Sequence, residues 1–215
     1  MGMALLLIVG CARYPELVPN RDQVPVDDLD RYFSELAWLT GGEKYDANSA
    51  ADVPKMIQKI IDDHAKRNGE IVFLIDKTGS MDDDIEHVRM ALTDIIKSLP
   101  RKTRLGMASY GDNRSEPASW FYHQDLTDDF DVIQAFLDDI RPGGGGDTPE
   151  SVYDAIYETV DVMSWTSTGN KLIIVIGDAP PHTEPSRTTY TQEQVIEKCV
   201  SAGLTVNLFP ILIGN

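Results

Sequence analysis

Two short runs of large apolar residues constrain the fold of this chain more than any other feature. Ile71–Ile75 is an unbroken run of mostly β-branched residues, and Lys171–Ile176 repeats the pattern after one polar residue. Runs without polar alternation are typical of strands that are buried on both faces of a parallel sheet. We therefore expect a sheet with helices packed on both of its faces.

Segments with helical spacing alternate with the strands. The expected helices, whose apolar residues recur every three or four positions, span 27–40, 53–67, 85–99, 130–140, 149–163 and 192–202. Further strands are expected at 105–110, 120–126 and 204–213, and the mixed polar and aromatic pattern of 120–126 indicates an edge strand. This alternation predicts an α/β fold, with a Rossmann-like, doubly wound, mostly parallel sheet flanked by helices.

The first residues predict a lipid anchor. The apolar stretch that starts at Met3 is too short to span a bilayer, which takes about 20 residues, but suits a secretory signal. It ends in a sequence that resembles a bacterial lipobox, in which the signal is cleaved before a cysteine that becomes lipid-modified, here Cys11. We expect a signal peptide at 1–10, a Pro-containing tether at 11–26, and a lipid-anchored location in a bacterial cell envelope. An intracellular location is expected if this leader is an artefact.

The charge balance bears on the class of partner. The 35 acidic residues outnumber the 19 basic ones, which gives a formal net charge of −16. A surface this negative repels phosphate backbones, so nucleic acid is not an expected partner. Cations and basic protein patches are better candidates, and membrane contact is expected only through the lipid anchor.

Three loops follow strands or lead into a helix at the predicted carboxyl edge of the sheet, where ligands bind in folds of this kind. They are Asp76–Met81, the Gly-rich Pro142–Glu150, and Gly177–His182. The candidate ligands are their carboxylates and hydroxyls: Asp76, Thr78, Ser80, Thr148 and Asp178. A hard cation such as Mg²⁺ takes six oxygens, usually including waters. These side chains could hold one cation and leave a position open for an incoming carboxylate.

The three motifs, in this order, resemble the metal-ion-dependent adhesion site of von Willebrand factor type A (VWA) domains. In that family the first loop reads Asp-x-Ser-x-Ser, and Thr78 keeps the hydroxyl of the first serine. Thr148 matches the family's loop threonine, and Asp178 matches its second aspartate, which often acts through water. The resemblance covers about 69–215. It implies a non-enzymatic module for adhesion or interaction, with one Mg²⁺, Mn²⁺ or Ca²⁺ whose shell is completed by an Asp or Glu of a partner protein.

The chain departs from the family pattern at its end. Family members usually continue past the last strand with a helix, often a short strand, and a final helix, whereas the sequence stops at Asn215. We therefore expect a VWA fold that lacks the usual C-terminal helix, together with the switching movement that this helix makes in some relatives. A helical segment at 27–68 precedes the domain and is a candidate to cover the exposed sheet face.

Two other functions fit parts of the pattern. The loop from Asp76 to Ser80 also resembles the phosphorylated loop of haloacid-dehalogenase-like phosphotransferases, in which the aspartate is a nucleophile beside Mg²⁺. That hypothesis leaves 143–150 unexplained, and Lys171 begins a strand instead of standing at its carboxyl end. The second alternative is a VWA subunit of an intracellular ATPase or metal-insertion complex.

Overall fold

The computed structural model describes residues 31–65, 69–100, 102–145, 148–201 and 204–214. The signal peptide, the tether and the lipidated Cys11 predicted from the sequence lie outside these residues. Within them, no helix combines the length and the apolar character that a membrane crossing requires.

Among the described residues the sheet has six strands in the order β1-β6-β5-β2-β3-β4, all parallel except β4, which pairs antiparallel with β3 at one edge. The strands are β1 (Tyr45–Ala47), β2 (Glu70–Asp76), β3 (Arg104–Tyr110), β4 (Phe121–Thr127), β5 (Lys171–Gly177) and β6 (Val206–Ile213). The predicted fold class, a doubly wound and mostly parallel sheet, is confirmed. The predicted edge strand is β4, whereas β1 at the other edge was not predicted.

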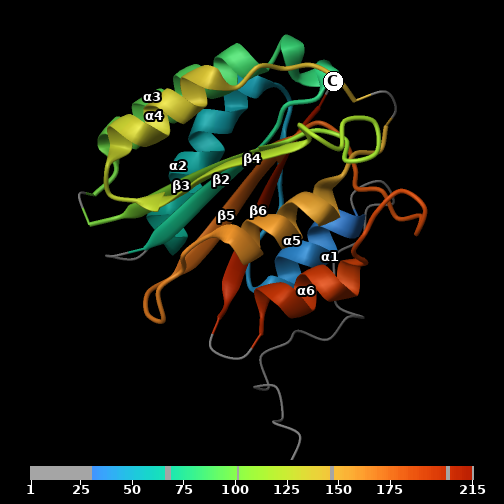
Figure 1. Ribbon diagram of the computed structural model, residues 1–215. Coiled ribbons are helices and arrows are strands. Elements are labelled where there is room, and N and C mark those ends of the chain that lie inside the picture. Colours follow the sequence, from blue (N-terminus) through green and yellow to red (C-terminus); the bar gives the residue numbers. More distant parts are fainter. Residues whose placement is uncertain (1–30, 66–68, 101, 146–147, 202–203, 215) are drawn as a thin grey trace, which may run out of the picture.

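Helices cover both faces of the sheet (Figure 1). One face carries α2 (Val53–His64), α3 (Ile85–Ser98) and α4 (Phe130–Asp139). The other carries α1 (Arg31–Thr40), α5 (Val152–Val162) and α6 (Gln192–Cys199). Two short 3₁₀ turns, η2 (Ala50–Asp52) and η3 (Gly79–Asp82), complete the described elements.

The central strand β2 explains the unbroken apolar run. Phe73 and Ile75 enter the core beneath α2 and α3, while Val72 and Leu74 enter the core beneath α5. Every residue of β2 is buried, because successive side chains point to opposite faces and helices cover both.

The two early helices both pack on β6, α1 on one face and α2 on the other. The end of α1 is tied to that strand, since the hydroxyl of Thr40 accepts a hydrogen bond from the backbone N–H of Leu208 at 3.1 Å. An ideal Cβ placed on Gly42 would lie 1.8 Å from the carbonyl oxygen of Leu208. Only glycine fits at this point. The turn that ends α1 therefore also sets the distance between α1 and the sheet.

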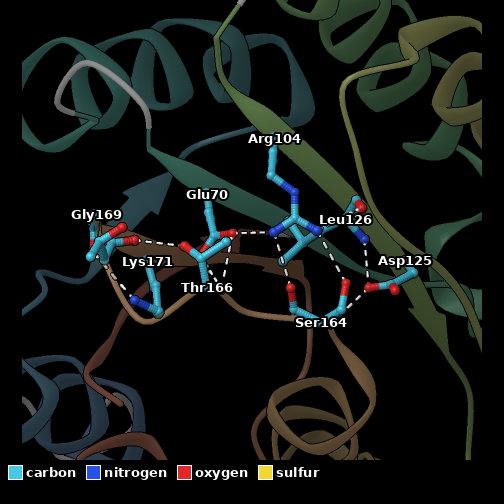
Figure 2. A network of polar contacts seen from close by, with 9 residues as sticks. Glu70, Arg104, Asp125, Leu126, Ser164, Thr166, Gly169 and Lys171 are labelled. Carbon is cyan, nitrogen blue, oxygen red and sulfur yellow. Dashed lines mark hydrogen bonds and ion pairs between the residues drawn. The ribbon is translucent and has the colours of Figure 1, made fainter. Parts of the chain in front are cut away.

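A polar network around the buried carboxylate of Glu70 joins the amino ends of β2 and β3 to the carboxyl end of β4 and to the loop before β5 (Figure 2). The carboxylate of Glu70, at the start of β2, forms an ion pair with Arg104 and accepts from the N–H of Thr166 at 3.2 and 3.0 Å. The Arg104 guanidinium also donates to the carbonyls of Ser164 and Leu126, each at 3.0 Å. The network therefore fastens the connection before β5 to β2, β3 and β4.

Candidate metal centre

The predicted ligands lie where β2 and β5 end side by side. The two strands are parallel neighbours, with Ile75 opposite Ile176. Asp76 is the last residue of β2, and Asp178 directly follows the last residue of β5. Both carboxylates are therefore delivered to the same edge of the sheet.

A chain of hydrogen bonds joins four of the five candidates. Oδ1 of Asp76 accepts from the backbone N–H of Thr78 at 2.8 Å and from its hydroxyl at 2.7 Å. The hydroxyls of Thr78 and Ser80 lie 3.2 Å apart. The Ser80 hydroxyl in turn donates to Oδ1 of Asp178 at 3.0 Å. Side chains from two loops distant in sequence thus form one continuous oxygen-rich group.

The second oxygens of the two aspartates distinguish this group from an ordinary pair of turns. Oδ2 of Asp76 and Oδ2 of Asp178 are buried, and neither has a hydrogen-bond partner in the described part of the chain. A buried polar atom without a partner is costly, and a bound cation would remove that cost. No group of three His, Cys, Asp or Glu side chains among the described residues could hold a metal. An ion here would depend on two carboxylates together with hydroxyls, a set that suits Mg²⁺, Mn²⁺ or Ca²⁺.

The electrostatic surroundings of Asp76 also favour a bound cation. Burial raises the pKa of its carboxyl to about 6, the charge of Asp178 acts in the same direction, and the two hydrogen bonds from Thr78 oppose the shift. The ionised form of Asp76 is therefore less favoured in the folded chain than in an exposed aspartate. A cation beside it would favour the ionised form and offset the repulsion between the two aspartates.

The Gly-rich loop is docked on the loop after β2. The N–H of Gly143 donates to the carbonyl of Lys77 at 2.9 Å, and the N–H of Gly79 donates to the carbonyl of Gly144 at 3.2 Å. Gly143, Gly144 and Gly145 have φ values of 153°, 74° and 74°, a region that favours glycine. The glycine run lets this loop pass close against the oxygen-bearing residues.

Thr148 stands apart from the other four candidates. It is exposed, and within the described residues its hydroxyl makes no hydrogen bond to any of them. Residues 146–147, which connect it to the glycine run, lie outside the described ranges. The fold thus assembles four candidates by direct contact and carries the fifth on the adjoining loop.

The loop of Thr148 is held against the loop of Asp178 by backbone hydrogen bonds. The N–H of Glu150 donates to the carbonyl of Pro180, and its carbonyl accepts from the N–H of His182, both at 2.9 Å. These bonds give Glu150 a strand-like pairing. The helix expected from position 149 consequently begins only at Val152.

Two buried side chains near the candidates could not be identified from the sequence. Tyr110 ends β3 opposite Asp76, and Glu150 is 3% exposed. Burial raises the pKa of the Tyr110 hydroxyl well above its ordinary value, and the charges of Asp76, Glu150 and Asp178 add to the shift. Tyr110 ends a predicted strand, but the sequence pattern does not distinguish a side chain near the site from one that only fills the core.

The phosphotransferase alternative is not favoured by this arrangement. Lys171 is the first residue of β5, and its ammonium donates to the carbonyl of Gly169 at 3.3 Å, beside the Glu70 network (Figure 2). Asp76 lies at the opposite end of the neighbouring strand. The lysine that such chemistry would use is therefore separated from the proposed nucleophile by the length of the sheet.

Comparison with known proteins assigns most of the chain to a family. The profile of the family described as von Willebrand factor A domain matches residues 70–207. The alpha-protein kinase vwkA of Dictyostelium discoideum is 30% identical over 120 residues, which are 53% of this chain and 19% of the kinase. The chain therefore spans only about a fifth of the length of this curated relative.

Solved structures with similar chain paths include two proteins of Bacteroides. The conserved hypothetical protein BatB of B. thetaiotaomicron is 17% identical, with a TM-score of 0.48 over 65% of this chain and 64% of that one. An aerotolerance-related membrane protein of B. fragilis is 19% identical, with a TM-score of 0.46 over 65% of each chain. The pilus adhesin SpaC of Lactobacillus rhamnosus GG is 17% identical, with a TM-score of 0.45 over 55% of this chain and 16% of the adhesin. The family assignment depends on none of these distant likenesses: the profile spans well over half of the chain and most of the sheet, and the chain belongs to the von Willebrand factor A domain family.

Proposed function

We propose that this chain is a protein-interaction module that depends on one divalent cation, Mg²⁺ or its substitutes Mn²⁺ and Ca²⁺. VWA domains are generally protein-interaction modules. The observation that carries the cation dependence is the hydrogen-bonded group of Asp76, Thr78, Ser80 and Asp178, in which two buried carboxylate oxygens have no partner among the described residues. Thr148 would join this group from the adjoining loop.

The cation would supply a positive charge to which a partner's carboxylate can bind. Without it, an acidic side chain approaching this edge meets the charges of Asp76 and Asp178 on a chain of net charge −16. Repulsion of that kind disfavours an acidic ligand. The partner we propose is therefore a protein that offers an Asp or Glu to the site, and its binding requires the cation.

Calorimetric titration with Mg²⁺ and Mn²⁺ tests the site. We expect one saturable site in the wild type and no measurable binding to Asp76→Ala, because the variant loses a buried ligand and the acceptor for Thr78. Asp161→Ala is the matched control, since it removes an exposed carboxylate at the far end of α5 and should bind as the wild type does. Full-strength binding by Asp76→Ala would show that the ion sits elsewhere.

The same proteins distinguish a binding module from an enzyme. An acyl-phosphate substrate is incubated with each of them in Mg²⁺, and phosphate release is measured. The interaction module predicts no release above background from the wild type. Turnover that is lost in Asp76→Ala would instead support a phosphotransferase with Asp76 as its nucleophile.

We also propose that the module is held at a bacterial envelope by a lipid on Cys11. The proposal depends on the short apolar leader and on the lipobox-like residues before the cysteine. Expression in a bacterial host with a clickable fatty acid should label the wild type and leave Cys11→Ser unlabelled. Equal absence of label in both would favour an intracellular VWA protein.

A further inference from the structure

The hydroxyl of Tyr110 lies beneath the candidate metal centre without a hydrogen-bond partner among the described residues. The side chain is fully buried at the end of β3, where it pairs with Asp76 across the sheet. An ideal Cβ placed on Gly177 would lie 3.0 Å from Oη of Tyr110 and 3.2 Å from Oδ2 of Asp76. The phenolic oxygen and the partnerless carboxylate oxygen therefore flank the same point of the β5 backbone.

A buried hydroxyl without a partner is unfavourable. Phenylalanine would fill the same space in the core without that cost, so a reason for the hydroxyl is needed. A phenol is protonated at neutral pH and can donate a hydrogen bond. Among the buried acceptors without a partner in the described residues, Oδ2 of Asp76 flanks the same backbone point as this hydroxyl, and the carboxylate is already restrained through Oδ1 by Thr78.

We infer that Tyr110 is a positioning residue of the cation site: its hydroxyl donates a hydrogen bond to Oδ2 of Asp76 when the cation is bound. Thr78 already donates two hydrogen bonds to Oδ1, so a third from Tyr110 would orient the carboxylate and leave one lone pair of Oδ2 for the ion. Partners of this kind orient metal ligands, and their loss typically weakens metal affinity 10- to 100-fold. This role depends on the cation site proposed above.

Tyr110→Phe tests the inference, because it removes one oxygen and keeps the ring. We expect its dissociation constant for Mg²⁺, measured by calorimetry, to rise at least tenfold above that of the wild type. We expect its urea midpoint in a chelator to be unchanged or higher, since the variant no longer buries a hydroxyl without a partner. Lower affinity without lower metal-free stability is a result that a packing role would not produce.

Tyr153→Phe is the matched control. Tyr153 is 2% exposed, its hydroxyl also lacks a hydrogen-bond partner among the described residues, and the groups that act on it, Tyr32, Glu35 and Glu193, belong to α1 and α6. We expect its Mg²⁺ affinity to equal that of the wild type. An unchanged affinity in Tyr110→Phe, or a loss shared equally by both variants, overturns the positioning role while leaving the cation site intact. A wild type that binds no cation overturns the proposed function itself, and with it the role of Tyr110.

Discussion

Replacing Glu70 by alanine is expected to lower the free energy of unfolding by about 3 kcal/mol. The side chain of Glu70 is 2% exposed, and its carboxylate is paired with Arg104. Its removal leaves the guanidinium without its counter-charge and the N–H of Thr166 without an acceptor. The estimate lies at the low end of the range for buried pairs, because the Arg104 side chain is 30% exposed and water can solvate part of it.

Urea denaturation of three variants measures this effect. Glu70→Gln retains an acceptor for Thr166 but not the charge, so we expect its loss of stability to fall between those of the wild type and Glu70→Ala. Asp63→Ala removes one partner of the ion pair between Lys59 and Asp63, whose side chains are 56% and 51% exposed, and should not change the midpoint. A Glu70→Ala protein as stable as Asp63→Ala would show that the network contributes little.

A change in the Glu70 network should affect stability without affecting cation binding. It lies at the amino ends of the strands, whereas Asp76 and Asp178 lie at the carboxyl ends. Folded Glu70→Ala should therefore bind Mg²⁺ with the affinity of the wild type. In parallel sheets of this kind the two edges have different roles, one structural and one for ligands.

The strands β2 and β5, which are buried on both faces, could be predicted from the sequence almost to the residue. Their ends differ from the predicted limits by at most one residue, because an apolar run covered by helices on both sides has few other structural interpretations. β1 could not be predicted in this way. It has three residues, only Ala47 among them is buried, and its place depends on pairing with β6 from the far end of the chain.

The same distinction holds at the candidate metal centre. Asp76 and Asp178 could be predicted to meet because each directly follows a recognisable buried strand, and parallel strands end at the same edge. The positions of Tyr110 and Glu150 near these aspartates could not be predicted. The side chain of Tyr110 lies near the site only because β3 pairs with β2 in one register, and Glu150 is drawn in by backbone bonds to the loop after β5.

Replacing Asp76 by asparagine is expected to stabilise the metal-free protein at neutral pH by about 2–3 kcal/mol while abolishing cation binding. The pKa of this carboxyl is about 6 in the folded chain, against an ordinary value of 3.8. Folding therefore favours the protonated form. Below pH 3.8 both states are protonated and burial of a charge costs nothing. As the pH rises towards and through 6, the unfolded chain ionises first and the wild type loses stability, whereas the neutral asparagine does not.

Urea denaturation in a chelator at pH 4, 5, 6 and 7.5 measures the difference between the two proteins. We expect it to be small at pH 4, to grow between pH 4 and 6, and to level off above that. Asp154→Asn is the control, because Asp154 is 1% exposed but its carboxylate accepts hydrogen bonds from Thr188 and from the N–H groups of Thr189 and Tyr190. A buried carboxylate that is satisfied in this way should be stabilising, so this variant should be less stable than the wild type at pH 7.5.

Saturating Mg²⁺ should reverse the order of Asp76→Asn and the wild type. A ligand that binds only the folded state raises its stability, by about 4.1 kcal/mol at a concentration of about 1,000 times the dissociation constant. The wild type gains this amount and the variant gains nothing. The wild type is then at least as stable as the variant, although it is the less stable of the two in a chelator. An asparagine variant that is less stable than the wild type in a chelator at pH 7.5 would show that the buried charge is compensated within the protein, and that the site does not need a cation to offset it.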